Sequence, residues 1–137
     1  MKVVLDTNVI ISAIIFGGKP RTIFELIIVD KKLTGIISKS VFDELLGVLK
    51  VKFKYSRSQL IRIEKLIEGS FIITHPQNIP KIIKEDRFDN QILAIIDETT
   101  IDYIISGDNH LLKIKTYKNV PIVPPHSFMR RISGETL

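Results

Sequence analysis

Short apolar runs alternate along the chain with longer stretches in which apolar residues recur at helical spacing. The runs have few polar positions, which is typical of strands buried on both faces of a parallel sheet. They lie at residues 3–5, 34–38, 71–73, 103–105 and 120–123. The pattern predicts one α/β domain over residues 1–137, with a mainly parallel central sheet of four to five strands flanked by helices.

Capping residues and prolines indicate where several elements begin. Ser40 is a candidate cap for the helix after the second run, and Ser56 with Gln59 resembles a capping box for the next helix. Pro20 suits the first turn of a helix. Because proline has no backbone donor, Pro121 predicts that the last strand lies at an edge of the sheet.

Acidic residues stand at the ends of two apolar runs and beside two helical stripes. Asp6 and Asp108 follow runs directly, and ligands of open α/β sheets bind outside the carboxyl ends of the strands. Glu44 and Asp89 fall on the inner sides of predicted helices, whereas Asp43 faces water. Helix capping explains any one of these acids alone. Four that converge would repel one another unless a cation neutralised them.

A divalent cation would reconcile these four acids with one another and with a phosphate substrate. Carboxylate oxygens bind Mg²⁺ or Mn²⁺, and such a centre activates water and stabilises charge on a phosphoryl group. Asp86 lies one turn from Asp89 and could share or replace its role. Polar neighbours of the acids are candidates for supporting or substrate-positioning roles: Asn8, Ser38, Asn90 and Ser106. The chemistry that follows is phosphodiester hydrolysis.

The charge balance favours a polyanionic partner without requiring one. The formal net charge is +5 and the isoelectric point is near 9.5, which suits RNA or DNA but also describes a generic basic surface. Residues 51–57 interleave Lys52, Lys54 and Arg57 with two aromatic residues, a pattern that could hold phosphates and stack bases. A solvated connection between helices with snorkelling lysines is the simpler interpretation of this segment.

The composition excludes several classes of site and of protein. The chain has no cysteine, so disulfides, thiolate nucleophiles and thiolate metal sites are excluded. No apolar run is long enough to cross a bilayer, and Met1 leads directly into the first run, so we expect a cytoplasmic protein that does not enter a membrane. Of the three histidines, His110 is nearest to a candidate acid, and a surface position is the simpler expectation for it.

Four segments together resemble one family. LDTNVIISAI, SKSVFDELLGVL, DRFDNQILAI and YIISGDNHLL, in this order and spacing, resemble the PIN-domain nucleases, and most of all the toxins of type II toxin–antitoxin pairs. The resemblance implies an Mg²⁺- or Mn²⁺-dependent endoribonuclease that acts on RNA. It also implies a homodimer and, for a toxin, a small antitoxin protein as partner.

The resemblance also assigns roles to individual residues. The family's acids fall on Asp6, Glu44, Asp89 and Asp108. The first three would hold the principal metal, and Asp108 would complete the site or hold a second, weaker ion. Ser106 stands where many members have threonine, which keeps the hydroxyl group.

Two other functions are consistent with parts of the sequence. VVLDTN and IISGD resemble parts of the signature of haloacid-dehalogenase-type phosphatases, but that chemistry needs an aspartate where this chain has Asn8. It also expects a second acid shortly after the Gly–Asp pair, and residues 109–112 offer none. The other alternative is a non-catalytic module that binds RNA or protein on the same fold, against which the presence of all four acids argues.

Overall fold

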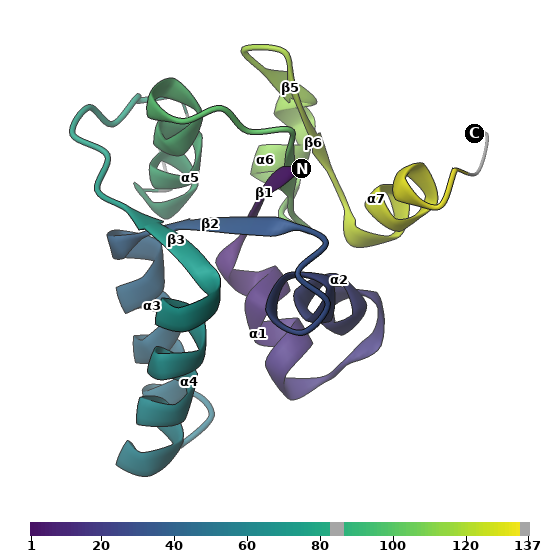
Figure 1. The fold of residues 1–137 in the computed structure, drawn as a ribbon. Coiled ribbons are helices and arrows are strands. Elements are labelled where there is room, and N and C mark those ends of the chain that lie inside the picture. Colours follow the sequence, from purple (N-terminus) through teal and green to yellow (C-terminus); the bar gives the residue numbers. More distant parts are fainter. Residues whose placement is uncertain (83–86, 135–137) are drawn as a thin grey trace.

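The computed structural model describes residues 1–82 and 87–134, with the side chains of all of these except residues 87–89. A central sheet with helices around it forms the body of this part of the chain (Figure 1). The strands are Lys2–Leu5 (β1), Thr34–Ser38 (β2), Phe71–Thr74 (β3), Tyr103–Ile105 (β4), Thr116–Tyr117 (β5) and Val120–Val123 (β6). The helices are Thr7–Ile15 (α1), Gly18–Ile28 (α2), Lys39–Val51 (α3), Arg57–Ser70 (α4), Arg87–Glu98 (α5), Asn109–Ile114 (α6) and Pro125–Ile132 (α7).

The sheet is mainly parallel, and the order in which its strands are added reverses at β1. Within the described residues its order is β3-β2-β1-β4-β6-β5. The pairs β1–β2, β1–β4, β2–β3 and β4–β6 are parallel, and only β5 runs antiparallel to its neighbour. Because β2 and β4 leave β1 on opposite sides, the crevice for ligands in such a sheet opens at the carboxyl end of β1. The expected α/β fold is confirmed.

The sheet has six strands in the described part of the chain, whereas four to five were expected, and the additional strand β5 changes which strand lies at the edge. The two-residue strand β5 pairs with β6 through a turn in which Lys118 and Asn119 both have positive φ. Strand β6 therefore lies between β4 and β5, so the prediction that Pro121 marks an edge strand was wrong. Proline is tolerated there because the residues of β6 that pair with β4 begin at Ile122.

The central strands β1 and β4 are buried because helices cover both faces of the sheet, whereas Ile72 of β3 is 48% exposed. Val3, Val4 and Leu5 of β1 are at most 1% exposed, and the same holds for Ile104 and Ile105 of β4. Helices α1 and α2 pack against each other, and α1 also packs against α3. Among the described helices, none is long and apolar enough to cross a membrane. The result is a rigid base from which the acidic residues project at the strand ends.

Helix α3 begins two residues earlier than the capping prediction implied. Ser38, the last residue of β2, has extended dihedrals and its Oγ accepts a hydrogen bond from the backbone N–H of Val41 at 3.2 Å. Ser38 is therefore the cap, and the assignment to Ser40 was wrong because strand and helix join without an intervening loop. The capping box of Ser56 and Gln59 is confirmed at the start of α4.

The β5–β6 hairpin is tied to helix α5. The hydroxyl of Tyr117 donates to the Asp97 carboxylate at 3.2 Å, and the ammonium of Lys118 pairs with the same carboxylate. Burial, together with this neighbouring carboxylate, raises the pKa of Tyr117 above its usual value. The hairpin thus fixes the carboxyl-terminal end of the helix on which Asp89 lies.

Candidate active site at the carboxyl ends of the strands

Asp6 lies at the carboxyl end of β1, where the chain turns into α1. It caps this helix, and its Oδ1 accepts a hydrogen bond from the backbone N–H of Asn8 at 3.2 Å. Its Oδ2 accepts a second hydrogen bond from the hydroxyl of Ser106 at 2.6 Å. Only 4% of Asp6 is exposed. A nearly buried carboxylate is costly unless its oxygens are bound, and these contacts hold it in one orientation.

Ser106 connects the two acids that end neighbouring strands. While its hydroxyl donates to Asp6, the same oxygen accepts a hydrogen bond from the backbone N–H of Asp108 at 2.9 Å. Ser106 is completely buried. Since β1 and β4 are adjacent and parallel, their ends meet at one edge, and this hydroxyl fixes the distance between the segments that follow them. The polar residue predicted to support the acids therefore does contact one of them directly.

Asp108 begins helix α6. Its Oδ1 accepts hydrogen bonds from the backbone N–H groups of His110 at 2.8 Å and Leu111 at 3.2 Å. The side chain is 25% exposed, so it faces the edge of the site that solvent reaches. His110 lies in the first turn of α6, with its Nδ1 3.8 Å from Asp108 Oδ1, too far for a hydrogen bond. Its side chain is 51% exposed, as the surface interpretation expected.

Glu44 reaches the same region from helix α3. The hydroxyl of Thr7 donates a hydrogen bond to Glu44 Oε2 at 2.8 Å, and Thr7 directly follows Asp6 in the chain. Glu44 is partly buried, whereas Asp43 is exposed and pairs with Lys39 at 2.7 Å. The predicted orientations of these two acids are confirmed. Thr7 itself is only 4% exposed and was not among the residues predicted for the site.

Thr7 could have been found from its position. A hydroxyl residue placed directly after an acid that ends a strand is within reach of whatever the acid binds. Its side chain also points inward from the first turn of α1, opposite to the exposed Asn8. The local sequence thus indicated the position of Thr7. It could not indicate Glu44 as its partner, because the two residues are 37 positions apart.

The structure describes only part of the region around the third predicted acid. Asp89 belongs to the first turn of α5, which packs against α3 and β2, but its side chain lies outside the described part. Asp86 lies outside the described residues. Asn90 is 7% exposed, and its Oδ1 accepts a hydrogen bond from the backbone N–H of Ile82 at 3.2 Å. Asn90 thus links α5 to the segment that precedes it.

Two further predicted supporting residues have structural roles in the described contacts. Ser38 is fully buried and caps α3, which sets the start of the helix that carries Glu44. Asn8 is exposed, and it contacts Asp6 through its backbone N–H. An exposed amide next to a buried carboxylate remains available to a substrate.

The donor atoms of this region suit a hard divalent cation. Ser106 donates to the Asp6 carboxylate and accepts from the backbone N–H of Asp108, and Thr7 donates to the Glu44 carboxylate. The carboxylates of these three acids offer only oxygen atoms, which Mg²⁺ and Mn²⁺ prefer. Among the side chains that the structure describes, no group of three or more histidines and acids is close enough to hold a metal ion by itself. Asp89, the remaining acid of the predicted metal site, is not among these side chains.

A separate hollow of about 280 Å³ opens between α1, α2 and α4. Its lining is apolar apart from Arg21 and Glu25, and none of the predicted site residues contributes to it. The Arg21 guanidinium donates to the backbone carbonyls of Ala13 at 2.8 Å and Ile14 at 3.1 Å, so it joins α2 to the end of α1. Catalytic chemistry is to be sought at the strand ends and not in this hollow.

Comparison with known proteins identifies the family of the chain. A family model described as the PIN domain matches residues 2–110, a stretch that contains Asp6, Glu44, Asp89 and Asp108. A search of curated proteins gives no match. Proteins with PIN domains are generally nucleases, and they typically use divalent metals. Because the match covers more than half of its length, the chain belongs to the PIN-domain family.

Proposed function

We propose that this protein is an endoribonuclease that hydrolyses RNA phosphodiester bonds with the help of Mg²⁺ or Mn²⁺. The observation that carries the proposal is the hydrogen-bonded chain from Asp6 through Ser106 to Asp108 at the ends of adjacent strands. A buried carboxylate held in this way at the mouth of a parallel sheet is typical of a binding centre for a cation and its phosphate ligand.

Asp6, Glu44 and Asp89 would hold the principal cation, and Asp108 would complete the site. When bound, the cation supplies a positive charge that acidifies water and stabilises charge on a phosphoryl oxygen. The protein's own part is orientation. Ser106 and Thr7 each donate a hydrogen bond to one carboxylate oxygen, which helps to hold the side chains of Asp6 and Glu44 in one orientation.

The proposal also names RNA as the substrate and a toxin of a toxin–antitoxin pair as the biological role. The formal net charge of +5 supports a polyanionic substrate. The resemblance of the four motifs to toxins supports a role as the toxin of a toxin–antitoxin pair, as a homodimer in the cytoplasm that an antitoxin protein inhibits. Growth arrest on induction of the wild type, but not of Asp6→Asn, would be the expected cellular result.

Cleavage of a pool of labelled RNAs tests the chemistry. We expect cutting with Mn²⁺ or Mg²⁺ and none with chelator. We expect Asp6→Asn to reduce the rate by about 100-fold or more, because even changes to residues that only support metal ligands cost about 10- to 100-fold. Asp43→Asn is the matched control, since this exposed acid is adjacent to Glu44 and should leave cleavage unchanged. Cutting that survives chelation, or full activity of Asp6→Asn, would contradict the proposal.

The third acid is assigned by the same assay. Loss of cleavage in Asp89→Asn with full activity in Asp86→Asn would support the assignment to Asp89, and the reverse result would move the role to Asp86. If the wild type binds the pool with strong salt dependence but never cuts it, the result would favour the alternative of a non-catalytic binding module. Release of phosphate from monoesters would favour the phosphatase alternative.

A further inference from the structure

The whole formal net charge of the chain lies in one short segment. Residues 45–63 contain five basic residues and no acidic one, while the other 118 residues contain 15 of each sign. The five are Lys50, Lys52, Lys54, Arg57 and Arg62. The basic character of the protein is therefore a local property of the region where α3 ends and α4 begins, and any field it exerts on a polyanion is concentrated there.

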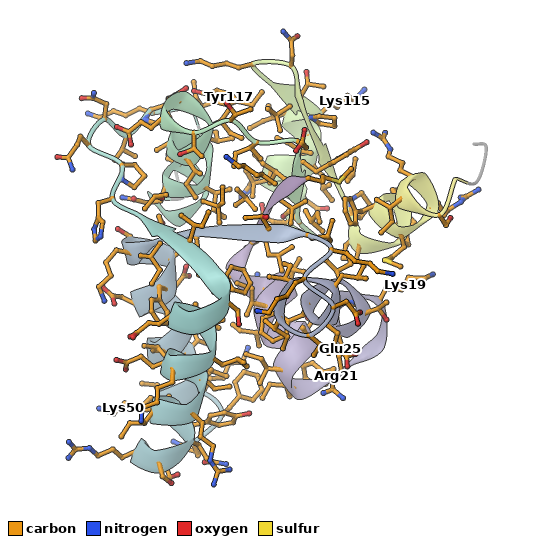
Figure 2. All side chains as sticks on the ribbon, in the orientation of Figure 1. Lys19, Arg21, Glu25, Lys50, Lys115 and Tyr117 are labelled. Carbon is orange, nitrogen blue, oxygen red and sulfur yellow. The ribbon has the colours of Figure 1, made fainter. Side chains whose placement is uncertain are left out.

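These five cations are exposed at the end of a helical hairpin. Helices α3 and α4 pack side by side and extend away from the sheet (Figure 1). Lys50 lies near their far end (Figure 2). All five cations are exposed, and none of them forms an ion pair with a carboxylate among the described residues. By contrast, Lys39 and Lys118 are both paired. The cations of this segment are thus available to an external anion.

Aromatic rings lie among the cations. Phe16, in the turn after α1, is 75% exposed. Its ring meets the ring of Phe53 edge to face, with centroids 6.4 Å apart and an interplanar angle of 75°. The ammonium of Lys52 lies 5.8 Å from the centroid of the Phe53 ring. An exposed phenylalanine contributes little to the core, but it offers a flat face on which a base can stack.

The basic segment lies within reach of the candidate active site. Glu44 lies within α3, and Lys52 caps the carboxyl end of this helix. The two residues are eight positions apart, which corresponds to about 12 Å along the helix axis. Val48 and Val51 continue the face that carries Glu44, and Val51 is 70% exposed. One polynucleotide strand can therefore lie along this face of α3 and contact both regions.

From these observations we propose that the α3–α4 tip, defined as residues 50–57 with Arg62 and Phe16, binds single-stranded RNA beyond the bond that is cut. The identity of the ligand as RNA rests on the proposed function. Lysines and arginine neutralise phosphates, while the Phe16–Phe53 pair stacks exposed bases, and this combination tolerates any sequence. An acidic protein surface would satisfy the cations but would leave the exposed Phe16 face unexplained, so a nucleic acid fits better.

The test is binding of a fluorescein-labelled, mixed-sequence, 20-nucleotide single-stranded RNA, followed by anisotropy in chelator over a series of salt concentrations. The tip variant is Lys52→Gln/Lys54→Gln/Arg57→Gln. The control is Lys2→Gln/Lys31→Gln/Lys32→Gln, which changes the net charge equally with exposed lysines at the amino ends of β1 and β2. We expect a loss of affinity of about ten-fold or more for the tip variant and two-fold or less for the control. The slope of log affinity against log salt should fall by about 2 in the tip variant only, at about 0.7 per phosphate contact.

Phe16→Ala tests stacking separately from charge. We expect affinity to fall by about five-fold or more with an unchanged salt slope, since stacking on an aromatic ring is not ionic. Because Phe16 is exposed, this variant should keep the thermal unfolding midpoint of the wild type. Equal losses in the tip and control variants, or an unaffected Phe16→Ala, would overturn the proposal. It would also be overturned if these variants bind RNA normally but change from dimer to monomer in light scattering, because the tip would then be an interface between copies.

The two proposals fail in different ways. Binding is measured in chelator and can be repeated in the Asp6→Asn background, so it does not depend on cleavage. A protein that binds through the tip but never cuts RNA would contradict the proposed function alone. A protein that cuts RNA with metal, but whose tip and control variants bind alike, would contradict the tip alone.

Discussion

At the scale of single residues, two buried hydroxyls organise the candidate site. Ser106 joins Asp6 to the backbone of Asp108, and Thr7, the residue after Asp6, donates to Glu44. A hydroxyl suits both positions because it donates to a carboxylate while its oxygen can accept from a backbone N–H. The short side chains also fix this geometry with few rotatable bonds. Neutral residues thus orient the acids, and a search for charged residues alone would miss them.

Substitution of Thr7 by valine tests this role. Valine has the same shape, so we expect the fold to persist while Glu44 loses the donor at 2.8 Å. The Mn²⁺ concentration that gives half-maximal RNA cleavage should rise about 10- to 100-fold, as is usual when a supporting hydrogen bond to a metal ligand is removed. Thr7→Ser should restore the wild-type value.

Thr22→Val is the matched control, because the exposed hydroxyl of Thr22 donates only to the backbone carbonyl of Gly18 within α2. It should leave the Mn²⁺ requirement unchanged. If Thr7→Val lowers the unfolding midpoint but keeps the wild-type Mn²⁺ requirement, then Thr7 is structural only and does not position Glu44.

At the scale of elements, two glycines show how differently a small residue can be used. Gly35 lies in β2 under the ring of Phe71, and a Cβ there would come within 2.5 Å of the Phe71 Cε2 atom. Phe71 is only 6% exposed and packs against Phe24, so its ring has little space to move. Gly47 lies in the middle of α3, and a Cβ there would meet nothing within 4 Å.

Alanine at these two positions should therefore have opposite effects. We expect Gly35→Ala to lower the free energy of unfolding by about 1–3 kcal/mol through overpacking. Gly47→Ala should raise it by about 0.5–1 kcal/mol, because glycine inside a helix has more backbone entropy to lose. Urea denaturation measures both. Equal effects of the two substitutions would show that the Phe71 ring adjusts without cost, and a smaller loss in Gly35→Ala/Phe71→Leu would locate the clash.

Local signals predicted most of these elements, and the errors have local causes. The capping box of Ser56 and Gln59 was visible because both partners lie within one turn. Ser38 was missed as the cap of α3 because it is also the last residue of β2, and a residue with both roles has no separate loop signal. Strand β5 has only two residues and exists because β6 pairs with it, so its own sequence carries no pattern. Pro121 was misplaced for the same reason.

At the scale of the whole molecule, the site follows from strand order more than from any motif. That Asp6 and Asp108 end adjacent strands is a consequence of the β1–β4 pairing, which joins residues about 100 positions apart. The sequence could predict that both acids end buried strands, but not which strands are neighbours. It could predict that Glu44 faces inward, but not that Thr7 is its partner. Contacts between remote residues are set by packing, which no local pattern records.

This origin of the site leads to a prediction about stability. The candidate ligands come from positions 6, 44, 89 and 108, so an unfolded chain cannot gather them, and a cation that they bind should stabilise only the folded state. Mn²⁺ at 100 times its dissociation constant should raise the free energy of unfolding by about 2.7 kcal/mol. Thermal unfolding with and without Mn²⁺ should show this as a higher midpoint for the wild type and for Asp43→Asn, but not for Asp6→Asn. An equal rise in all three proteins would mean that the cation binds elsewhere and that Asp6 is not one of its ligands.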